Sequence, residues 1–322
     1  MNEKIENLLK EERKFPPSQE LIENANATDS WYTDAEKNRL EFWQKQALTR
    51  ISWFKEPTEI LDDSNPPFFK WFKDGELNLS YNCLDRHLES DGERVAFYWE
   101  GEPGDTQKIT YQDLYERVCK LSNALKKLGV EKGDRVAIYL GMTPEIVVSM
   151  LACARIGAVH SVVFGGFSSE ALADRINDAK AKTVITADGA WRRGDIVPLK
   201  NNVDGSLDLT DYVKNVIVVK RTEQEINMTD GRDFWYHDIT ENESTVCEPE
   251  VMNAEDLLYI LYTSGTTAKP KGIVHTQAGY LTGVTTTHHE VFDIKEDDIY
   301  WCAADCGWVT GHSYIVYGPL AN

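Results

Sequence analysis

Residues 262–272 read YTSGTTAKPKG and follow the apolar run 257–261. Glycine and hydroxyl residues, followed by two lysines that flank a proline, favour a flexible loop over a helix or a strand. Small residues let the backbone approach an anion closely, hydroxyls donate hydrogen bonds to phosphate oxygens, and Lys271 supplies a positive charge. The stretch does not fit the Walker A pattern, because Ile273 follows its second glycine. The sequence therefore indicates a polyphosphate-binding loop, with an ordinary surface loop as the alternative.

The same stretch resembles the phosphate-binding signature of the AMP-forming acyl-CoA synthetases, T-S/T-G-S/T-T-G-x-P-K-G, and meets nine of its ten positions. The departure is Ala268, which stands where the pattern has glycine. If that glycine has a positive φ, alanine costs roughly 1 kcal/mol there and stiffens the loop. The resemblance implies that Thr263 and Lys271 act in catalysis. It also implies that the ATP phosphates bind to Thr263, Ser264, Gly265, Thr266, Thr267, Lys269, Lys271 and Gly272.

Composition and charge exclude several classes of protein. The 322 residues exceed the usual size of one domain, and 42% of them are hydrophobic, enough for a substantial core. The net charge of −19 argues against binding to nucleic acids or membrane surfaces, because both are polyanionic. The six cysteines lack C-x-x-C spacing and no long apolar run occurs, so we expect a cytoplasmic protein with reduced thiols. Cys302 and Cys306 are four residues apart, but zinc patterns are tighter and no metal ligands are assigned.

The region from Val95 to Lys220 alternates between helical and strand patterns. Thr110 and Asp113 form a capping box, and apolar residues then recur at helical spacing as far as Gly129. Single helices between strands require right-handed crossovers and a parallel sheet that is covered on both faces. The predicted fold class is therefore α/β with a doubly wound parallel sheet, whose ligands bind beyond the carboxyl ends of the strands. Strands are predicted at 135–140, 158–163, 183–187 and 216–219, and helices at 143–156 and from Ser168.

The first part of the chain consists of charged helical pieces separated by breakers. We expect residues 1–94 to wrap the outside of a larger body, residues 95–322, which would be the first part of an AMP-binding domain. Acetyl-CoA synthetases carry a nearly identical N-terminal segment, including SYNCLDRHL at 80–88, whereas most other members of the superfamily do not. The resemblance therefore indicates the acetyl-CoA synthetase branch.

Aromatic and charged residues of this segment are predicted to be structural. Aromatic side chains at such a density serve more often in packing than in binding. The row Asp85, Arg86 and His87 is predicted to be a charge-paired helix end rather than a catalytic group. The expected anchors are Trp31, Trp43 and Trp53, and the expected packing residues are Phe68, Phe69, Trp71 and Phe72.

Two further loops follow predicted strands. In VFGGF, 163–167, paired glycines before a capped helix indicate either a tight turn or a place where a ligand approaches the backbone. In WRRG, 191–194, the two arginines either clamp a phosphate or are solvated. Asp195 departs from the basic residue often found there. In acetyl-CoA synthetases the matching loops cradle the adenine and 3′-phosphate of coenzyme A, which implies a site formed by Phe164, Gly165, Gly166, Arg192 and Arg193.

The last part of the sequence contains a helix and a candidate pocket. The helix is expected from His275 and Thr276 to about Glu290; its adjacent His288 and His289 lie about 100° apart and cannot chelate a metal as an i, i+4 pair would. In the segment 300–320, the spacing of the residues alone favours Trp308 as a core residue. In short-chain acyl-CoA synthetases, however, the matching W-V-T phrase lines the carboxylic acid pocket. The resemblance thus implies an acid pocket formed by Trp308, Val309 and Thr310.

The resemblance as a whole implies ATP-dependent activation of acetate to acetyl-AMP, followed by transfer to coenzyme A. The implied substrates and cofactors are acetate, ATP, Mg²⁺ and coenzyme A. An enzyme for propionate or 3-hydroxypropionate is an alternative, and a non-catalytic nucleotide-binding fragment is an alternative of another class. The chain matches the first half of such enzymes and lacks their Y-G-x-T-E loop, ribose-binding aspartate and C-terminal lysine. We therefore expect residues 1–322 alone not to form acyl-AMP at a useful rate; the sequence does not specify the oligomeric state.

Overall fold

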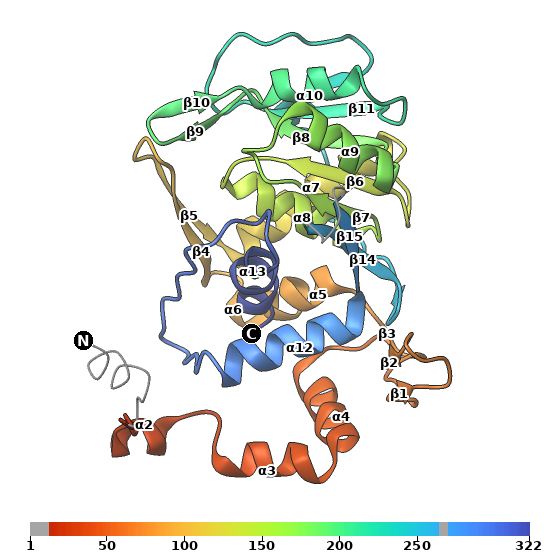
Figure 1. The fold of residues 1–322 in the computed structure, drawn as a ribbon. Helices are drawn as coiled ribbons and strands as arrows, with labels where there is room; N and C mark the ends of the chain where they lie inside the picture. Colours follow the sequence, from red (N-terminus) through yellow and green to blue (C-terminus); the bar gives the residue numbers. More distant parts are fainter. Residues whose placement is uncertain (1–12, 264–269) are drawn as a thin grey trace, which may run out of the picture.

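A seven-stranded sheet forms the centre of the computed structural model, which describes residues 13–263 and 270–322 (Figure 1). Its strand order is β12-β11-β8-β6-β7-β14-β15. The first six strands are parallel to their neighbours, and β15 runs antiparallel to β14 at one edge. The α/β prediction is confirmed. The strands are β6 (Arg135–Tyr139), β7 (Val159–Val162), β8 (Thr183–Ala187), β11 (Asn215–Val219), β12 (Asp233–Trp235), β14 (Leu257–Thr263) and β15 (Lys271–Thr276).

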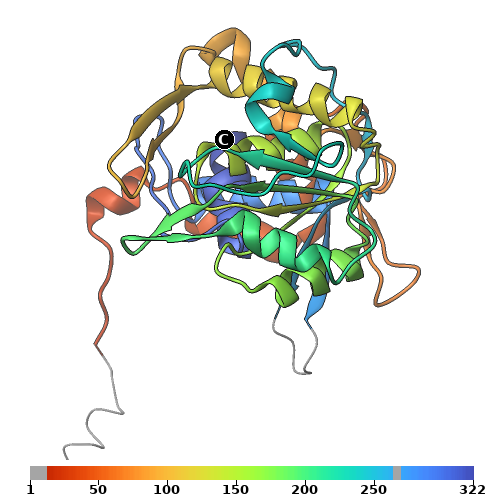
Figure 2. The same ribbon diagram turned by 90° about the horizontal axis from the view of Figure 1, so that it is seen from above.

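Helices cover both faces of the sheet, as Figure 2 shows from above. α7 packs on α8 at one face, and α9 packs on α10 at the other. The predicted capping box is present, because Thr110 and Asp113 exchange side-chain and backbone hydrogen bonds at the start of α7. Gly129 follows the end of α7 with φ of +82°, a conformation that favours glycine. The four helices are α7 (Tyr111–Lys127), α8 (Pro144–Arg155), α9 (Ser169–Ala179) and α10 (Leu199–Leu207).

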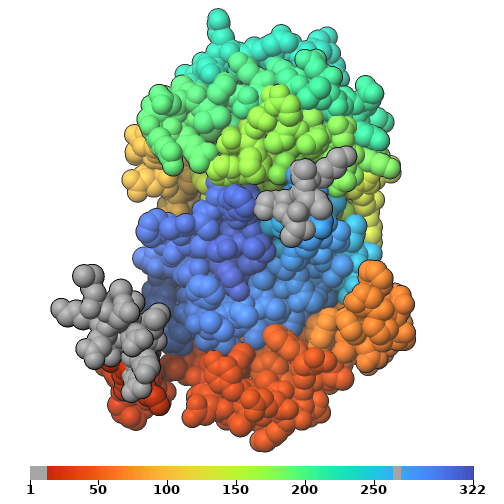
Figure 3. All heavy atoms as spheres, viewed as in Figure 1, coloured from red at the N-terminus to blue at the C-terminus, as the bar shows by residue number. Residues whose placement is uncertain are grey.

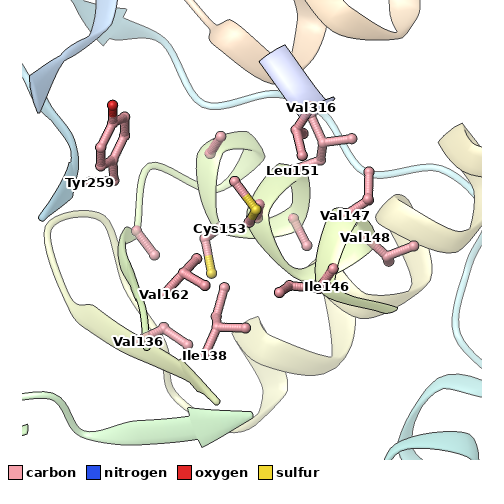
Figure 4. Packing of buried hydrophobic residues seen from close by; sticks show 14 of the residues in the cluster. Val136, Ile138, Ile146, Val147, Val148, Leu151, Cys153, Val162, Tyr259 and Val316 are labelled. Atoms are coloured by element: carbon pink, nitrogen blue, oxygen red, sulfur yellow. The ribbon is translucent and has the colours of Figure 1, made fainter. Parts of the chain in front are cut away.

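The largest apolar cluster lies between the sheet and these helices. All but the first residue of β6 are buried, as are all of β7 and β8, which is expected of parallel strands covered on both faces. All residues of α8 except Glu145 are buried, and the helix meets β6 and β7 through aliphatic side chains (Figure 4). Burying side chains of this size contributes about 1.5–3 kcal/mol each. The labelled members are Val136, Ile138, Ile146, Val147, Val148, Leu151, Cys153, Val162, Tyr259 and Val316.

The N-terminal helices lie along the outside of α12 (Gln277–Glu290), at the bottom of Figure 1. Arg50 at the end of α4 forms an ion pair with Glu290, and the Asn26 amide donates to the carbonyl oxygens of His289 and Ile294. Trp53 donates from Nε1 to Ala47 O over 3.1 Å. The contacts of Arg50 and Asn26 join the N-terminal helices to the end of α12 and the residues after it, while the wrapping role and the division at residue 94 stay predictions. The helices are α2 (Gln19–Asn24), α3 (Asp29–Lys37) and α4 (Arg39–Arg50).

The aromatic stretch divides into buried and exposed residues. Phe72 is buried and Trp71 is half-buried against the core, as predicted. Phe68 and Phe69 are 71% and 51% exposed, so the packing prediction is wrong for them. The physical reason is that both residues lie in the excursion between β1 (Leu61–Asp62) and β2 (Lys70–Trp71), which projects from the body in Figure 1.

An ion pair joins this segment to the sheet domain. Both guanidinium Nη atoms of Arg155 donate to the Asp85 carboxylate, over 2.7 and 2.8 Å, and Arg155 is buried. The Asn78 amide donates to the Ala154 and Arg155 carbonyl oxygens nearby. Asp85 is therefore charge-paired, but with the end of α8 rather than within its own helix end.

The remaining elements are short. The six cysteine thiols are free, and no helix among the described residues combines the length and the hydrophobicity needed to cross a membrane. The helices are α5 (Leu79–Cys83), η1 (Asp85–His87), α6 (Leu88–Asp91), α11 (Tyr236–Thr240), α13 (Val309–Gly311), the π-helix η2 (His312–Tyr317) and α14 (Gly318–Ala321). The strands are β3 (Glu76–Leu77), β4 (Val95–Glu100), β5 (Thr106–Thr110), β9 (Ala190–Arg192), β10 (Asp195–Val197) and β13 (Met252–Asn253).

Candidate active site

The predicted phosphate loop connects β14 and β15, which pair with each other as antiparallel strands. The two strands stay in register as far as the pair Thr263 and Lys271, so Thr263, Lys271 and Gly272 are strand residues. The prediction of a loop over the whole stretch 262–272 is wrong at these three positions and at Tyr262, because pairing between β14 and β15 overrides the weak strand propensity of the sequence. The side chains of Thr263 and Lys271 are exposed at the end of the hairpin. Outside the described residues lie Ser264, Gly265, Thr266, Thr267, Ala268 and Lys269.

The end of this hairpin that leads into the phosphate loop contacts α9. Tyr262 is buried, and its hydroxyl donates a 2.6 Å hydrogen bond to Asp178 Oδ2. The Arg175 guanidinium lies 5.5 Å from the centre of the Tyr262 ring. Burial, together with the hydrogen bond to Asp178, raises the pKa of Tyr262, so its hydroxyl remains a donor at neutral pH. A Cβ at Gly272 would lie 3.2 Å from the Tyr262 ring, so glycine lets this ring cover β15.

His275 belongs to β15 and α12 begins two residues later, so the expected helix start at His275 is wrong. The His275 ring stacks on Tyr259 in β14 with centroids 4.4 Å apart, an interaction that a strand allows directly across the hairpin. His288 is buried in α12 and its burial lowers its pKa to about 4, while the neighbouring His289 lies 3.3 Å from Glu290. Both positions fit the predicted packing or surface role.

The VFGGF turn is fixed from β6. The Tyr139 hydroxyl donates to Phe167 O over 2.6 Å, and it accepts a hydrogen bond from the Asn202 amide over 3.1 Å. A Cβ at Gly165 would lie 3.2 Å from the Leu140 carbonyl oxygen, a close approach that leaves little room for a side chain. The turn is therefore tight, as one of the two sequence interpretations required.

The WRRG stretch follows the sheet strand β8 and contains the turn of the two-stranded hairpin formed by β9 and β10. Arg192 in β9 pairs with Asp195 in β10, and the turn residues Arg193 and Gly194 have φ of +55° and +84°. Both arginines follow β8, as predicted, but the turn at 193–194 folds the chain back onto β9, so Arg192 is itself a strand residue. The two arginines consequently occupy different positions, one in a strand and one at the exposed turn.

Arg192 and the VFGGF turn meet. The Arg192 guanidinium lies 4.6 Å from the centre of the Phe164 ring, within the range of a cation–π interaction. A Cβ at Gly166 would collide with the same guanidinium and would lie 2.6 Å from the Phe164 ring, so glycine lets both side chains lie against the backbone. The structure thus brings Phe164, Gly166 and Arg192 together, whereas it shows no such contact for Arg193 among the described residues.

The W-V-T residues border the same place. The Trp308 ring lies 6.1 Å from the Phe164 ring, and Trp308 precedes the short helix α13. Trp308 and Val309 are 50% and 47% exposed, and Thr310 is exposed, so spacing alone gave the wrong expectation that Trp308 is a core residue. Figure 3 shows the blue surface of the C-terminal segment bordering the green surface of the segment that includes α9.

Several residues of the site were not found from the sequence. Tyr139 carries a signal that could have indicated it, because it ends a strand at the ligand-binding edge of the predicted sheet. Arg175 and Asp178 carry no such signal, since their contacts depend on how α9 packs. Asp305 is a further case: its carboxylate accepts from Gly307 N over 2.7 Å, and burial raises its pKa despite that bond. In the part of the chain that is described, no group of three potential metal ligands occurs.

The fold and site define a doubly wound α/β protein in which the VFGGF turn contacts both Arg192 of the β9–β10 hairpin and the exposed Trp308. The chain belongs to the family described as AMP-binding enzyme, which matches residues 84–322. Residues 28–83 match the family described as acetyl-coenzyme A synthetase N-terminus. Both matches confirm the resemblance to the acetyl-CoA synthetase branch.

Curated relatives agree with these matches. The chain is 61% identical over 323 aligned residues to acetyl-coenzyme A synthetase of Streptomyces avermitilis, covering 100% of the chain and 49% of the relative. It is 58% identical to acetyl-coenzyme A synthetase of Streptomyces coelicolor, covering 100% and 50%, and 52% identical to that of Pasteurella multocida, covering 98% and 49%. The chain therefore spans about half the length of these relatives.

Proposed function

We propose that this chain supplies the N-terminal half of an acetate–CoA ligase. In this reaction a carboxylate oxygen of acetate attacks the α-phosphorus of ATP, and pyrophosphate leaves. The coenzyme A thiolate then attacks the acetyl carbon, so that a C–S bond forms and AMP leaves. The observation that carries the proposal is the identity of 61% along the whole chain to a relative named acetyl-coenzyme A synthetase.

The phosphate role rests on the end of the hairpin. Thr263 and Lys271 are cross-strand partners with exposed side chains, so a hydroxyl and an ammonium group face the same place. Such donors bind phosphate oxygens through charge-assisted hydrogen bonds and stabilise the charge that develops on departing pyrophosphate. Mg²⁺ bound with ATP would neutralise phosphate charge. The roles of Ser264, Gly265, Thr266, Thr267, Lys269 and Gly272 in phosphate binding are part of the same proposal.

The coenzyme A role rests on the contact between Phe164 and Arg192. The guanidinium offers charge for a phosphate, and the adjacent aromatic ring offers a surface for an adenine. Gly165, Gly166 and Arg193 complete the proposed coenzyme A site.

The acid pocket is proposed to be Trp308, Val309 and Thr310. The exposed indole and isopropyl groups provide apolar walls, and the Thr310 hydroxyl provides one polar contact. The 6.1 Å contact between the Trp308 and Phe164 rings supports a pocket that borders the proposed coenzyme A site. A cytoplasmic setting is proposed as well, because it keeps six free cysteines reduced.

The test uses a chimera in which residues 1–322 are followed by the second half of the Streptomyces avermitilis relative, hereafter the completed enzyme. We expect acetate-dependent exchange of labelled pyrophosphate into ATP. Exchange that is faster with propionate or 3-hydroxypropionate than with acetate would assign the chain to a longer acid. A folded chimera that binds ATP without any acid-dependent exchange would favour the non-catalytic nucleotide-binding alternative.

A further inference from the structure

One cluster outside the proposed ligand contacts connects two loops that are far apart in the sequence. The Arg175 guanidinium lies 4.5 Å from the Phe167 ring centre and 5.5 Å from the Tyr262 ring centre. Phe167 ends the VFGGF turn, and Tyr262 precedes the phosphate stretch. Arg175 is buried between them, and its Nη1 donates to Ala171 O within α9 over 2.6 Å, which fixes its direction. One side chain thus contacts the bases of both proposed ligand loops.

Asp178 adds a contact that reaches only one of these loops. It lies one turn after Arg175 on α9 and accepts the 2.6 Å hydrogen bond from the Tyr262 hydroxyl. The Tyr262 ring in turn covers Gly272, its partner across the hairpin. Since Tyr262 and Gly272 form the pair next to Thr263 and Lys271, a displacement of the ring would displace the last strand residues before the phosphate stretch.

We propose that Asp178 and Arg175 are positioning residues for the proposed reaction. Asp178 fixes the loop end of the β14–β15 hairpin through its hydrogen bond with Tyr262. Arg175 contacts both Tyr262 and the VFGGF turn and so fixes the two together. Neither residue touches substrate in this role. The inference rests on the proposed function for its kinetic consequences, but the anchoring itself is a property of the chain without substrates.

The two anchors predict different kinetic effects. Loss of the Asp178 contact lets the loop end of the β14–β15 hairpin adopt conformations that do not bind ATP. The apparent affinity for ATP then falls in proportion to the fraction of molecules in the binding-competent conformation. In the completed enzyme, Asp178→Ala should raise the KM for ATP by roughly 3- to 10-fold and leave the KM for coenzyme A unchanged. Arg175→Met keeps an unbranched side chain of similar length without the charge, and it should raise both KM values by a similar factor.

Three variants separate positioning from a general loss of stability. Tyr262→Phe removes only the hydroxyl and should match Asp178→Ala, and the double variant should be no worse than either single one, because both remove the same contact. Asp178→Asn retains an acceptor and should restore most of the ATP affinity. Asp174→Asn is the matched control, since it removes one exposed carboxylate from the preceding turn of the same helix.

The closing experiment measures hydrogen exchange of residues 270–276 in the unliganded 1–322 chain. We expect Asp178→Ala and Tyr262→Phe to accelerate this exchange by roughly 3- to 10-fold, and Asp174→Asn to leave it unchanged. Equal exchange in all four proteins, or additive effects in the double variant, would overturn the proposal. If the exchange changes as expected but the completed enzyme is inactive, the anchoring is correct and the proposed function fails instead.

Discussion

The VFGGF turn and the segment at 300–310 lie side by side, with Phe164 and Trp308 as neighbours, yet they are held differently. The turn is fixed by hydrogen bonds from the Tyr139 hydroxyl to Gly165 O and Phe167 O, at 3.2 and 2.6 Å. In the other segment the Trp308 backbone is fixed through Asp305 O, whereas its side chain is half-exposed. The difference shows that a buried strand residue can fix a turn through side-chain hydrogen bonds, whereas the exposed Trp308 side chain lies against few neighbours.

Lowering the pH should have the largest effect, because buried histidines lie next to the exposed segment and their protonation would destabilise the fold. His312, four residues after Trp308, is buried, and its burial lowers its pKa to about 4. Burial, and then the neighbouring His312, also lower the pKa of His160. In the unfolded chain each histidine takes up a proton near pH 6.5, whereas the lowered pKa keeps it neutral in the folded chain. The free energy of unfolding is therefore highest above pH 6.5 and decreases as the pH falls toward 4. The slope is about 1.4 kcal/mol per pH unit for each histidine.

The measurement is the midpoint of urea unfolding at pH 7.5, 6 and 5. His312→Asn should reduce the pH dependence, and His237→Asn, at an exposed position in α11, serves as the control. An equal midpoint at pH 7.5 and pH 5 in the unchanged chain would contradict the prediction.

Lys271→Ala tests whether the loop end of the β14–β15 hairpin takes part in the reaction. In the completed enzyme we expect a higher KM for ATP and a lower kcat, since a lost charge-assisted hydrogen bond is worth roughly 1.5–3 kcal/mol. That energy corresponds to about a 10- to 100-fold loss of kcat/KM for ATP. Lys45→Ala, at an exposed position on α4, is the control. Unchanged adenylation kinetics would remove the hairpin from the mechanism.

Trp308→Gly tests the exposed segment directly. If the indole limits acid length, its loss should shift the completed enzyme from acetate toward butyrate. Each buried methylene contributes about 0.8 kcal/mol, so the ratio of the two kcat/KM values should change by up to about 15-fold. Trp301→Gly, at an 84% exposed tryptophan in the same stretch, controls for backbone flexibility. A fixed acetate-to-butyrate ratio would show that Trp308 does not shape the pocket.

Ala268→Gly should have the smallest effect. The position lies outside the described residues, and the expectation comes from the signature alone. Glycine should leave the KM for ATP of the completed enzyme unchanged or improve it, by an amount that corresponds to about 1 kcal/mol or less. A clear loss of activity would mean that the alanine suits this loop better than glycine.

The sheet and its helices were predictable because their signals are local. A capping box at Thr110, a glycine after α7 and apolar runs at 135–140 and 183–187 each act over a few neighbouring residues. The strand β15 was missed because its glycine and lysine gain strand geometry only by pairing with β14. Arg175 and Asp178 were missed for a similar reason, since no periodicity in α9 says which helix face meets Tyr262. The pairing of Asp85 with Arg155 likewise depends on the assembled fold.

The position of β14 also affects how the chain is made. β7 pairs with β14 through His160 and Tyr259, which are about 100 residues apart. A ribosome adds about 5–20 residues per second, so the edge of β7 that pairs with β14 stays unpaired for roughly 5–20 s during synthesis. Throughout that interval its backbone donors and acceptors offer a template for pairing with another nascent chain. Slower translation would lengthen the interval, and a holdase that binds the growing chain would protect the edge until β14 emerges.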